Sequence, residues 1–122
     1  MKIIVVDDSR AVHAFVEDVF SESQAELVHF YDAQDFVDAL AIGKIEADFV
    51  LLDWEMPKMN GIDALPIIVK TTTLPVMMMT SKNALSDIAE AMSRGASDYV
   101  MKPFTKEILL GKVSQSFGLK VA

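Results

Sequence analysis

The chain has 122 residues, of which 52% are hydrophobic and 24% are charged, and it contains no cysteine. This composition favours one globular domain over residues 1–122, and it excludes disulfide bonds, thiolate metal sites and a cysteine nucleophile. The formal net charge of −7 disfavours direct binding to nucleic acid or to an anionic membrane, because both attract basic surfaces.

The N-terminal apolar run is too short to direct the chain to a membrane. Residues 3–6 are apolar, but Asp7 and Asp8 follow before a signal-peptide core or a membrane span could form. We therefore expect a soluble, unprocessed cytoplasmic protein, and the absence of cysteine suits a reducing compartment.

Short apolar runs alternate along the chain with segments whose apolar residues recur at helical spacing. The runs predict strands that are buried on both faces. They are residues 3–6, 26–31, 49–53, 76–79 and 98–101. The segments after them predict amphipathic helices, and residues able to cap or end a helix stand at their boundaries. These residues are Ser9, Asp32, Gly43, Gly95, Thr105 and Gly118.

The third and fourth helical segments carry distinctive residues. Pro66 lies inside the third, where a proline removes a backbone hydrogen bond, so we expect a late helix start or a kink. The fourth segment has four apolar residues at helical spacing, which predict its buried face. They are Leu85, Ile88, Ala89 and Met92.

About five units of strand and helix predict an open parallel sheet with helices on both faces, because parallel strands are joined by right-handed crossovers. Ligands of such sheets bind beyond the carboxyl ends of the strands. Residues that carry chemistry should therefore follow the predicted strands.

Polar side chains of a consistent kind do follow them. Asp7 and Asp8 follow the first strand, Asp53 ends the third, Thr80 follows the fourth and Lys102 follows the fifth. Clustered carboxylates repel one another unless a cation joins them, and Mg²⁺ prefers such oxygen ligands. An ionised aspartate can attack phosphorus, while an ammonium and a hydroxyl can hold phosphoryl oxygens. The pattern predicts Mg²⁺-dependent phosphoryl transfer to Asp53.

Four segments that contain these residues resemble the motifs of response-regulator receiver domains. They are Val5-Val6-Asp7-Asp8-Ser9, residues 51–61, residues 75–80 and residues 95–104. The loop after Asp53 is similar to that of CheY-type chemotaxis regulators. The resemblance implies a flavodoxin-like, doubly wound (βα)5 fold with the strand order 2-1-3-4-5 that is known for CheY.

The resemblance also implies roles at the metal site. Asp53 would accept a phosphoryl group from a phosphohistidine of a sensor histidine kinase. Mg²⁺ would be held by Asp8, by Asp53 and by the backbone carbonyl of Glu55, and Asp7 would orient a water bound to the metal. The protein would catalyse only its own phosphorylation and dephosphorylation, so it would not be an enzyme acting on other substrates.

A second set of residues matches the parts of the family that respond to phosphorylation. Thr80 and Tyr99 match the switch pair, in which the hydroxyl moves to a phosphoryl oxygen and the ring turns inward. Lys102 would bond the phosphoryl group, and the peptide between Lys102 and Pro103 is expected to be cis.

Further residues are expected to adjust the lifetime and the output of the signal. Trp54, Glu55 and Lys82 flank the pocket, and we hypothesise that Glu55 and Lys82 pair across its mouth and hinder hydrolysis. The output is expected to be a phosphorylation-dependent contact with a downstream protein, through the last helices and the strand around Tyr99. Ile108 and Lys112 belong to that surface, which could also form a homodimer.

Two other functions remain open from the residues. Haloacid-dehalogenase-type phosphatases use a similar set with a second acid two residues after the nucleophile, where Glu55 stands. Alternatively, the chain is the receiver part of a longer regulator with a DNA-binding or enzymatic output domain. His13 and His29 are interpreted as surface or packing residues, since neither has a second histidine at ligand spacing.

Overall fold

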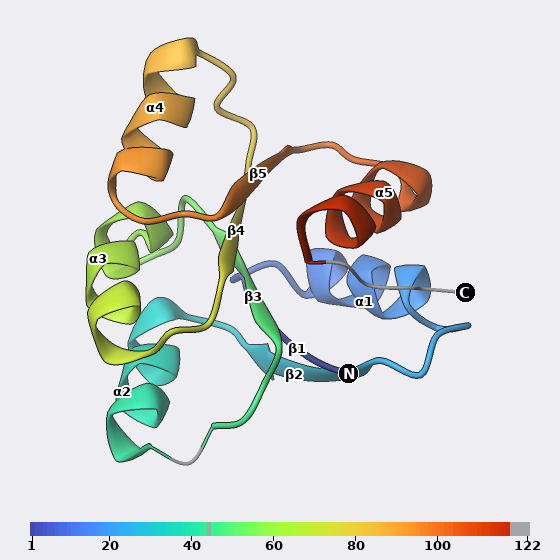
Figure 1. Cartoon of the computed structure of the whole chain (residues 1–122), viewed down its shortest axis with the longest axis horizontal. Helices are drawn as coiled ribbons and strands as arrows, with labels where there is room; N and C mark the ends of the chain where they lie inside the picture. The colour runs from blue at the N-terminus through green and yellow to red at the C-terminus, as the bar shows by residue number, and fades with distance from the viewer. Residues whose placement is uncertain (44, 118–122) are drawn as a thin grey trace.

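The computed structural model describes residues 1–43 and 45–117, in which five strands and five helices alternate (Figure 1). The strands are β1 (Lys2–Val6), β2 (Glu26–Phe30), β3 (Phe49–Asp53), β4 (Val76–Thr80) and β5 (Asp98–Met101). The helices are α1 (Arg10–Val19), α2 (Ala33–Ile42), α3 (Gly61–Thr71), α4 (Leu85–Ser93) and α5 (Lys106–Phe117). None of these helices has the length and apolar character needed to cross a bilayer.

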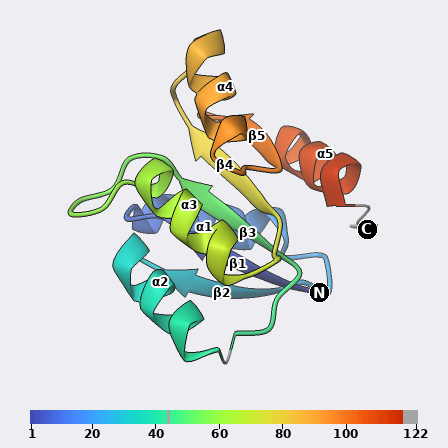
Figure 2. The same ribbon diagram turned by 60° about the vertical axis from the view of Figure 1, so that its left-hand side comes forward.

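The strands form one parallel sheet in the order β2-β1-β3-β4-β5, which confirms the expected strand order. Helices α1 and α5 lie on one side of the sheet, and α2, α3 and α4 lie on the other (Figures 1 and 2). The fold is therefore the doubly wound arrangement that the alternating pattern predicts.

Both faces of the sheet are covered by apolar side chains. Alternate residues of each central strand enter opposite cores: Ile3 and Val5 pack on the side of α1 and α5, whereas Ile4 and Val6 pack on the side of α2 and α3. This double burial explains why the strands are continuous apolar runs. The methionines 77–79 of β4 are fully buried, so they fill the core.

The helix ends follow the capping residues in the sequence. The side chains of Ser9 and Asp32 accept hydrogen bonds from the amides of Val12 and Asp35, at 3.3 and 2.7 Å. Gly43 ends α2 in the left-handed conformation, with φ 77°. Thr105 likewise accepts from the amide of Ile108 at the start of α5. The expected stop at Gly118 lies outside the described residues.

Two expectations about helices need correction. Of the two effects expected of Pro66, the late start does not occur: helix α3 begins at Gly61 and continues through Pro66 to Thr71. In α4 the buried residue is Ala91, whereas Leu85 and Met92 are 84% and 45% exposed. Of the expected apolar residues, Ile88 packs against the core, but Leu85 and Met92 do not, because spacing identifies an apolar stripe without saying whether all of that stripe lies on the sheet.

Candidate functional site

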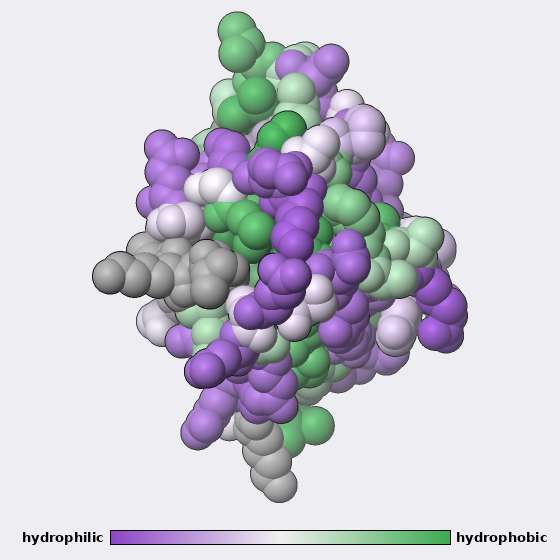
Figure 3. Space-filling model, turned by 90° about the vertical axis from the view of Figure 1, so that its right-hand side faces the viewer, coloured by the Kyte–Doolittle hydropathy of each residue, from purple (hydrophilic) through white to green (hydrophobic). Residues whose placement is uncertain are grey.

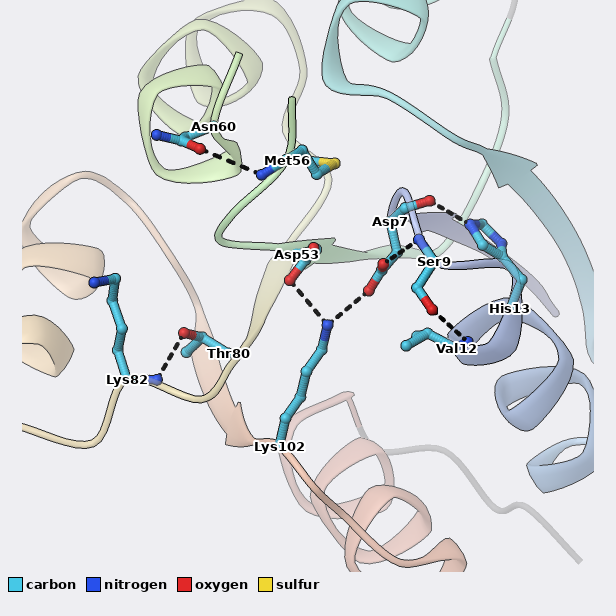
Figure 4. A network of polar contacts seen from close by, with 10 residues as sticks. All are labelled: Asp7, Ser9, Val12, His13, Asp53, Met56, Asn60, Thr80, Lys82 and Lys102. Carbon is cyan, nitrogen blue, oxygen red and sulfur yellow. Dashed lines mark hydrogen bonds and ion pairs between the residues drawn. The ribbon is translucent and has the colours of Figure 1, made fainter. Parts of the chain in front are cut away.

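The strand register brings the acidic residues and a lysine to one edge of the sheet. Val6 pairs with Leu52, so the next residues along the two strands, Asp7 and Asp53, are neighbours at the carboxyl ends. Lys102 follows β5 directly, and its amide donates a hydrogen bond of 2.8 Å to the carbonyl of Thr80. Figure 4 shows the side chains of Asp7, Asp53 and Lys102 converging.

Lys102 joins the two buried carboxylates. Its Nζ lies 2.8 Å from Oδ2 of Asp7 and 2.9 Å from Oδ1 of Asp53. Burial alone would lower the pKa of Lys102, but the hydrogen bonds and charges of Asp7 and Asp53 outweigh it and raise that pKa. The ammonium is therefore a fixed positive charge beside Asp53.

The electrostatic environment of Asp53 is unusual for a carboxyl group. Burial raises its pKa to about 6, and the charges of Asp7 and Asp8 act in the same direction, while the hydrogen bond from Lys102 opposes them. Because ionising this carboxyl group in its site is unfavourable, a cation placed nearby stabilises the ionised form. At neutral pH it is still mostly ionised and can act as a nucleophile.

A divalent cation would fit beside these carboxylates. Asp7, Asp8 and Asp53 each offer an oxygen, and these oxygens lie within 4.8 Å of one another. Ligands on opposite sides of Mg²⁺ are about 4 Å apart, so only small side-chain movements are needed. Asp8 is exposed and Asp7 is buried, which places the cluster at the edge of the solvent. The cluster is a candidate metal site.

Asp7 has a second structural role. Its Oδ1 accepts a hydrogen bond of 2.8 Å from the amide of Ser9, while its Oδ2 accepts from Lys102. Both oxygens are thus engaged within the protein. Asp7 therefore shapes the turn between β1 and α1 as well as the charge of the site.

The backbone of Lys82 lies between Thr80 and Tyr99. Its amide donates a hydrogen bond of 3.0 Å to Oγ1 of Thr80, and its carbonyl accepts a hydrogen bond from the hydroxyl of Tyr99. The Tyr99 ring is buried in the core on the side of α2 and α3. One peptide segment therefore connects Thr80 with Tyr99, the two residues expected to form a switch pair.

Comparisons with known proteins identify the fold family. The model of the response regulator receiver domain matches residues 3–114. The chain belongs to the response regulator receiver family. Chemotaxis protein CheY1 of Helicobacter pylori is 30% identical over 125 residues, covering 97% of this chain and 98% of that protein.

Two further similarities extend the comparison. The Francisella response regulator 1452 receiver domain superposes with a TM-score of 0.85 and 25% identity, over 96% of each chain. The uncharacterized transcriptional regulatory protein YcbL of Bacillus subtilis is 32% identical over 110 residues, covering 90% of this chain but 48% of that protein. The family is typically not enzymatic, which favours the receiver interpretation over the phosphatase alternative.

The loop that follows Asp53 in this receiver domain is packed closely onto the strand. A Cβ atom on Gly61 would lie 1.7 Å from the carbonyl oxygen of Asp53, and the Gly61 amide donates a hydrogen bond of 2.8 Å to the carbonyl of Trp54. The side chain of Asn60 accepts a hydrogen bond from the amide of Met56. Gly61 and Asn60 therefore position the loop, and their roles depend on contacts that the sequence pattern does not display.

Glu55 and Lys82 form an ion pair and line a surface pocket of the receiver domain together with Trp54. Oε1 of Glu55 lies 3.4 Å from Nζ of Lys82, and the two side chains are 65% and 37% exposed. Nζ of Lys82 also lies 5.7 Å from the centre of the buried Trp54 ring. The three flanking residues thus form one group beside Asp53.

A second concave surface of the receiver domain lies between α4, β5 and α5. It encloses about 500 Å³, and its lining includes Tyr99, Ile108 and Lys112 together with Ile88 and Met92 of α4. Ile108 is 51% exposed. In Figure 3, which views the side bearing α1 and α5, hydrophobic patches lie among hydrophilic side chains. The structure therefore brings together the residues expected to form the output surface.

The histidines of the receiver domain are arranged in a way that the sequence pattern missed. His13 on α1 is buried, and its Nδ1 lies 2.5 Å from Nδ1 of His29 on β2. Burial lowers the pKa of His13. The buried position of His13 agrees with its interpretation as a packing residue. The contact with His29 is not visible in the spacing, because packing of α1 beside β2 brings together residues that are distant in the sequence.

Proposed function

We propose that Asp53 accepts a phosphoryl group from a phosphohistidine of a sensor histidine kinase, in a reaction that depends on Mg²⁺. The observation that carries this proposal is the position of the Lys102 ammonium, 2.9 Å from Oδ1 of Asp53 and within the acidic cluster. An anionic nucleophile with a fixed cation beside it suits the transfer of a negatively charged group.

The proposed transfer uses the carboxylate of Asp53, the ammonium of Lys102 and the hydroxyl of Thr80. A carboxylate oxygen of Asp53 forms a bond to phosphorus while the bond from phosphorus to the donor's imidazole nitrogen breaks, and that nitrogen keeps the electron pair and takes up a proton. The ammonium of Lys102 and the hydroxyl of Thr80 donate hydrogen bonds to phosphoryl oxygens. Because Asp53 is buried, few waters compete with the incoming group.

Mg²⁺ is the metal that best suits the acidic cluster. Asp8, Asp53 and the backbone carbonyl of Glu55 would hold it, and Asp7 would orient one of its waters. When bound, the ion offsets the negative charge on the transferring phosphoryl group. It would also offset the repulsion between the carboxylates of the cluster.

Phosphorylation would be sensed through Thr80 and Tyr99. When the Thr80 hydroxyl turns to the phosphoryl group, the amide of Lys82 loses the acceptor that it has at 3.0 Å. The segment around Lys82 then moves, and its carbonyl carries the Tyr99 hydroxyl with it. This route connects Asp53 with the surface between α4 and α5.

The output is a phosphorylation-dependent protein contact on that surface. Tyr99, Ile108 and Lys112 line its groove together with Met92, an exposed apolar residue of α4. The chain would act as a single-domain, CheY-like cytoplasmic protein without direct contact with nucleic acid. The same surface could join two phosphorylated copies, and the partial coverage of YcbL keeps a longer regulator as the alternative.

The acceptor and the metal are tested together by mass spectrometry. Wild-type protein would be incubated with acetyl phosphate and Mg²⁺, and we expect a mass gain of one phosphoryl group that Asp53→Asn lacks. Trp54 lies beside Asp53, so its fluorescence should report Mg²⁺ binding, and Asp8→Ala should weaken that binding. A full mass gain in Asp53→Asn would place the phosphoryl group elsewhere.

Two controls separate the alternatives. Steady turnover of p-nitrophenyl phosphate would favour a phosphatase, whereas a receiver domain should give little. For the output surface, sedimentation with and without beryllofluoride would compare wild type with Ile108→Lys and with Ile42→Lys, a change of an exposed isoleucine on α2. Self-association that only Ile108→Lys abolishes would support the α4-β5-α5 surface.

A further inference from the structure

The pair formed by His13 and His29 lies outside the groups proposed to transfer the phosphoryl group. His29 pairs in register with Val5 on the neighbouring strand, and its ring meets the ring of His13 from α1. The Tyr31 ring packs on His13 with 4.3 Å between centroids. The two rings are therefore held together by α1 and β2 rather than by a flexible loop.

The second nitrogen of each ring determines where the ring proton lies. Nε2 of His13 is 2.7 Å from the carbonyl oxygen of Asp7 (Figure 4), and Nε2 of His29 is 2.6 Å from Oε1 of Glu17. A carbonyl and a carboxylate only accept hydrogen bonds, so each Nε2 must carry a hydrogen. In two neutral rings, both Nδ1 atoms then present bare lone pairs to each other.

Two lone pairs that face each other at 2.5 Å repel unless a cation lies between them. We propose that His13 and His29 form a binding site for a divalent transition metal ion of the Zn²⁺ class, with Nδ1 of each ring as a ligand. Bonds of about 2.0 to 2.1 Å place two such nitrogens roughly 3 Å apart, so the rings need to separate by less than about 1 Å.

The surroundings match those of histidines that bind metals. Such histidines donate their other ring hydrogen to a carboxylate or a backbone carbonyl, which fixes the ring and its tautomer. Glu17 and the carbonyl of Asp7 have these positions here. Imidazole ligands suit Zn²⁺, Ni²⁺ and Cu²⁺, whereas Mg²⁺ prefers the oxygens of the acidic cluster.

A shared proton is the simpler cation, and it is the alternative that the experiment must separate from a metal ion. On His13 the charge would be buried, since the exposed fraction of that residue is 3%, whereas on His29 it would lie beside the carboxylate of Glu17. The side chain of His29 is 22% exposed, so a metal ion could keep water ligands on that side. Because His13 also bonds the carbonyl of Asp7, the ion would be joined to the acidic cluster through one ring.

The test measures Zn²⁺ binding by competition with a chromophoric chelator, using the full chain without a histidine tag. Excess Mg²⁺ would occupy the acidic cluster. We expect one Zn²⁺ per chain, with affinity lowered at least about tenfold in His29→Gln and about tenfold in Glu17→Ala. Asp18→Asn, an exposed change on α1, is the matched control and should bind Zn²⁺ as the wild type does. Asp8→Asn, measured without Mg²⁺, reports any Zn²⁺ that the acidic cluster holds instead.

A spectroscopic measurement can identify the metal ligands in the wild-type protein, without any substitution. Electron paramagnetic resonance of Cu²⁺ bound to the wild-type protein should show coupling to imidazole nitrogens. Three results would each overturn the proposal: no Zn²⁺ binding, which leaves a shared proton between the rings; equal affinity in folded His29→Gln; or loss of the ion in Asp8→Asn alone. A thermal melt of His29→Gln without metal verifies that it is folded.

Discussion

Arg94, at the end of α4, donates a hydrogen bond of 3.2 Å from Nη1 to the backbone carbonyl of Ile62 in α3. Within a helix this carbonyl would accept from the residue four positions later, which is Pro66 and has no amide hydrogen. Arg94 therefore replaces a hydrogen bond that the proline removes, and it ties α3 to α4.

This relationship predicts a coupling between Pro66 and Arg94. Arg94→Ala should destabilise the wild-type protein more than it destabilises Pro66→Ala, in which the helix supplies its own donor, and the difference should be about 1 kcal/mol. The measurement is urea unfolding of the four proteins. Glu90→Ala removes only the ion pair of Arg94 with Glu90, so its effect should be the same in both backgrounds. If Arg94→Ala lowers the free energy of unfolding equally in the wild-type and Pro66→Ala backgrounds, Arg94 does not replace the hydrogen bond that the proline removes.

Stability should depend on pH through Asp53 when no divalent cation is present. Its pKa is raised from 3.8 to about 6 in the folded protein, so the unfolded chain loses this proton first as pH rises. The contribution of Asp53 to stability is then lost between about pH 4 and pH 6. Asp53→Asn has no such titration. As pH rises across that interval, the free energy of unfolding of the variant should therefore increase relative to that of the wild type, by up to roughly 3 kcal/mol.

The measurement for Asp53 is the free energy of unfolding of both proteins from pH 4 to pH 7.5 in a chelating buffer. When Mg²⁺ replaces the chelator, it should stabilise the wild type more than Asp53→Asn. The difference between their free energies of unfolding should then become smaller or change sign. A gap between the two proteins that does not change with pH would argue against the raised pKa.

Replacing Gly61 and Gly111 with alanine should have opposite effects on the stability of the protein. Gly61→Ala would put a Cβ atom 1.7 Å from the carbonyl of Asp53, which forces the loop away and should destabilise the protein by about 1 to 3 kcal/mol. Gly111 lies in α5, where a Cβ meets nothing within 4 Å. Gly111→Ala should therefore stabilise by about 0.5 to 1 kcal/mol. Thermal melts measure both effects, and a Gly61→Ala variant at least as stable as the wild type would contradict the close approach.

The ion pair of Glu55 and Lys82 should lengthen the life of the proposed phosphoryl group by hindering attacking water. Exposed pairs contribute about 0.2 to 1 kcal/mol, so Glu55→Gln and Lys82→Ala should lose phosphate faster by less than about tenfold. The rate of phosphoryl loss would be measured after the donor is removed. Added salt should reduce the difference in this rate between each variant and the wild type. Lys70→Ala, an exposed change on α3, is the control. If the phosphoryl group lasts as long or longer in both variants, the ion pair does not hinder the attacking water.

The sheet and the edge that carries the site could be predicted from the sequence because their signals are local. A strand buried on both faces is a continuous apolar run, and the polar residue that ends it marks the carboxyl edge. Asp53, Thr80 and Lys102 are found in this way. The strand order came instead from the resemblance of the motifs, since apolar runs alone do not specify neighbours.

Contacts between distant side chains could not be predicted in this way. His13 and His29 meet only because α1 packs beside β2, and the bond from Arg94 to Ile62 depends on how α4 lies against α3. Leu85 belongs to the apolar stripe of α4 by its spacing but is 84% exposed, because spacing defines a stripe and not the surface that it contacts. These features require the three-dimensional arrangement of the helices.

The position of Lys82 has a consequence for how the signal could be adjusted. Its backbone joins Thr80 to Tyr99, whereas its side chain pairs with Glu55. Any residue except proline can make these backbone hydrogen bonds, so a substitution of the Lys82 side chain can alter the duration of the proposed phosphorylated state and leave the transmission to Tyr99 intact. Timing and transmission are thus separable by mutation although they meet in one residue.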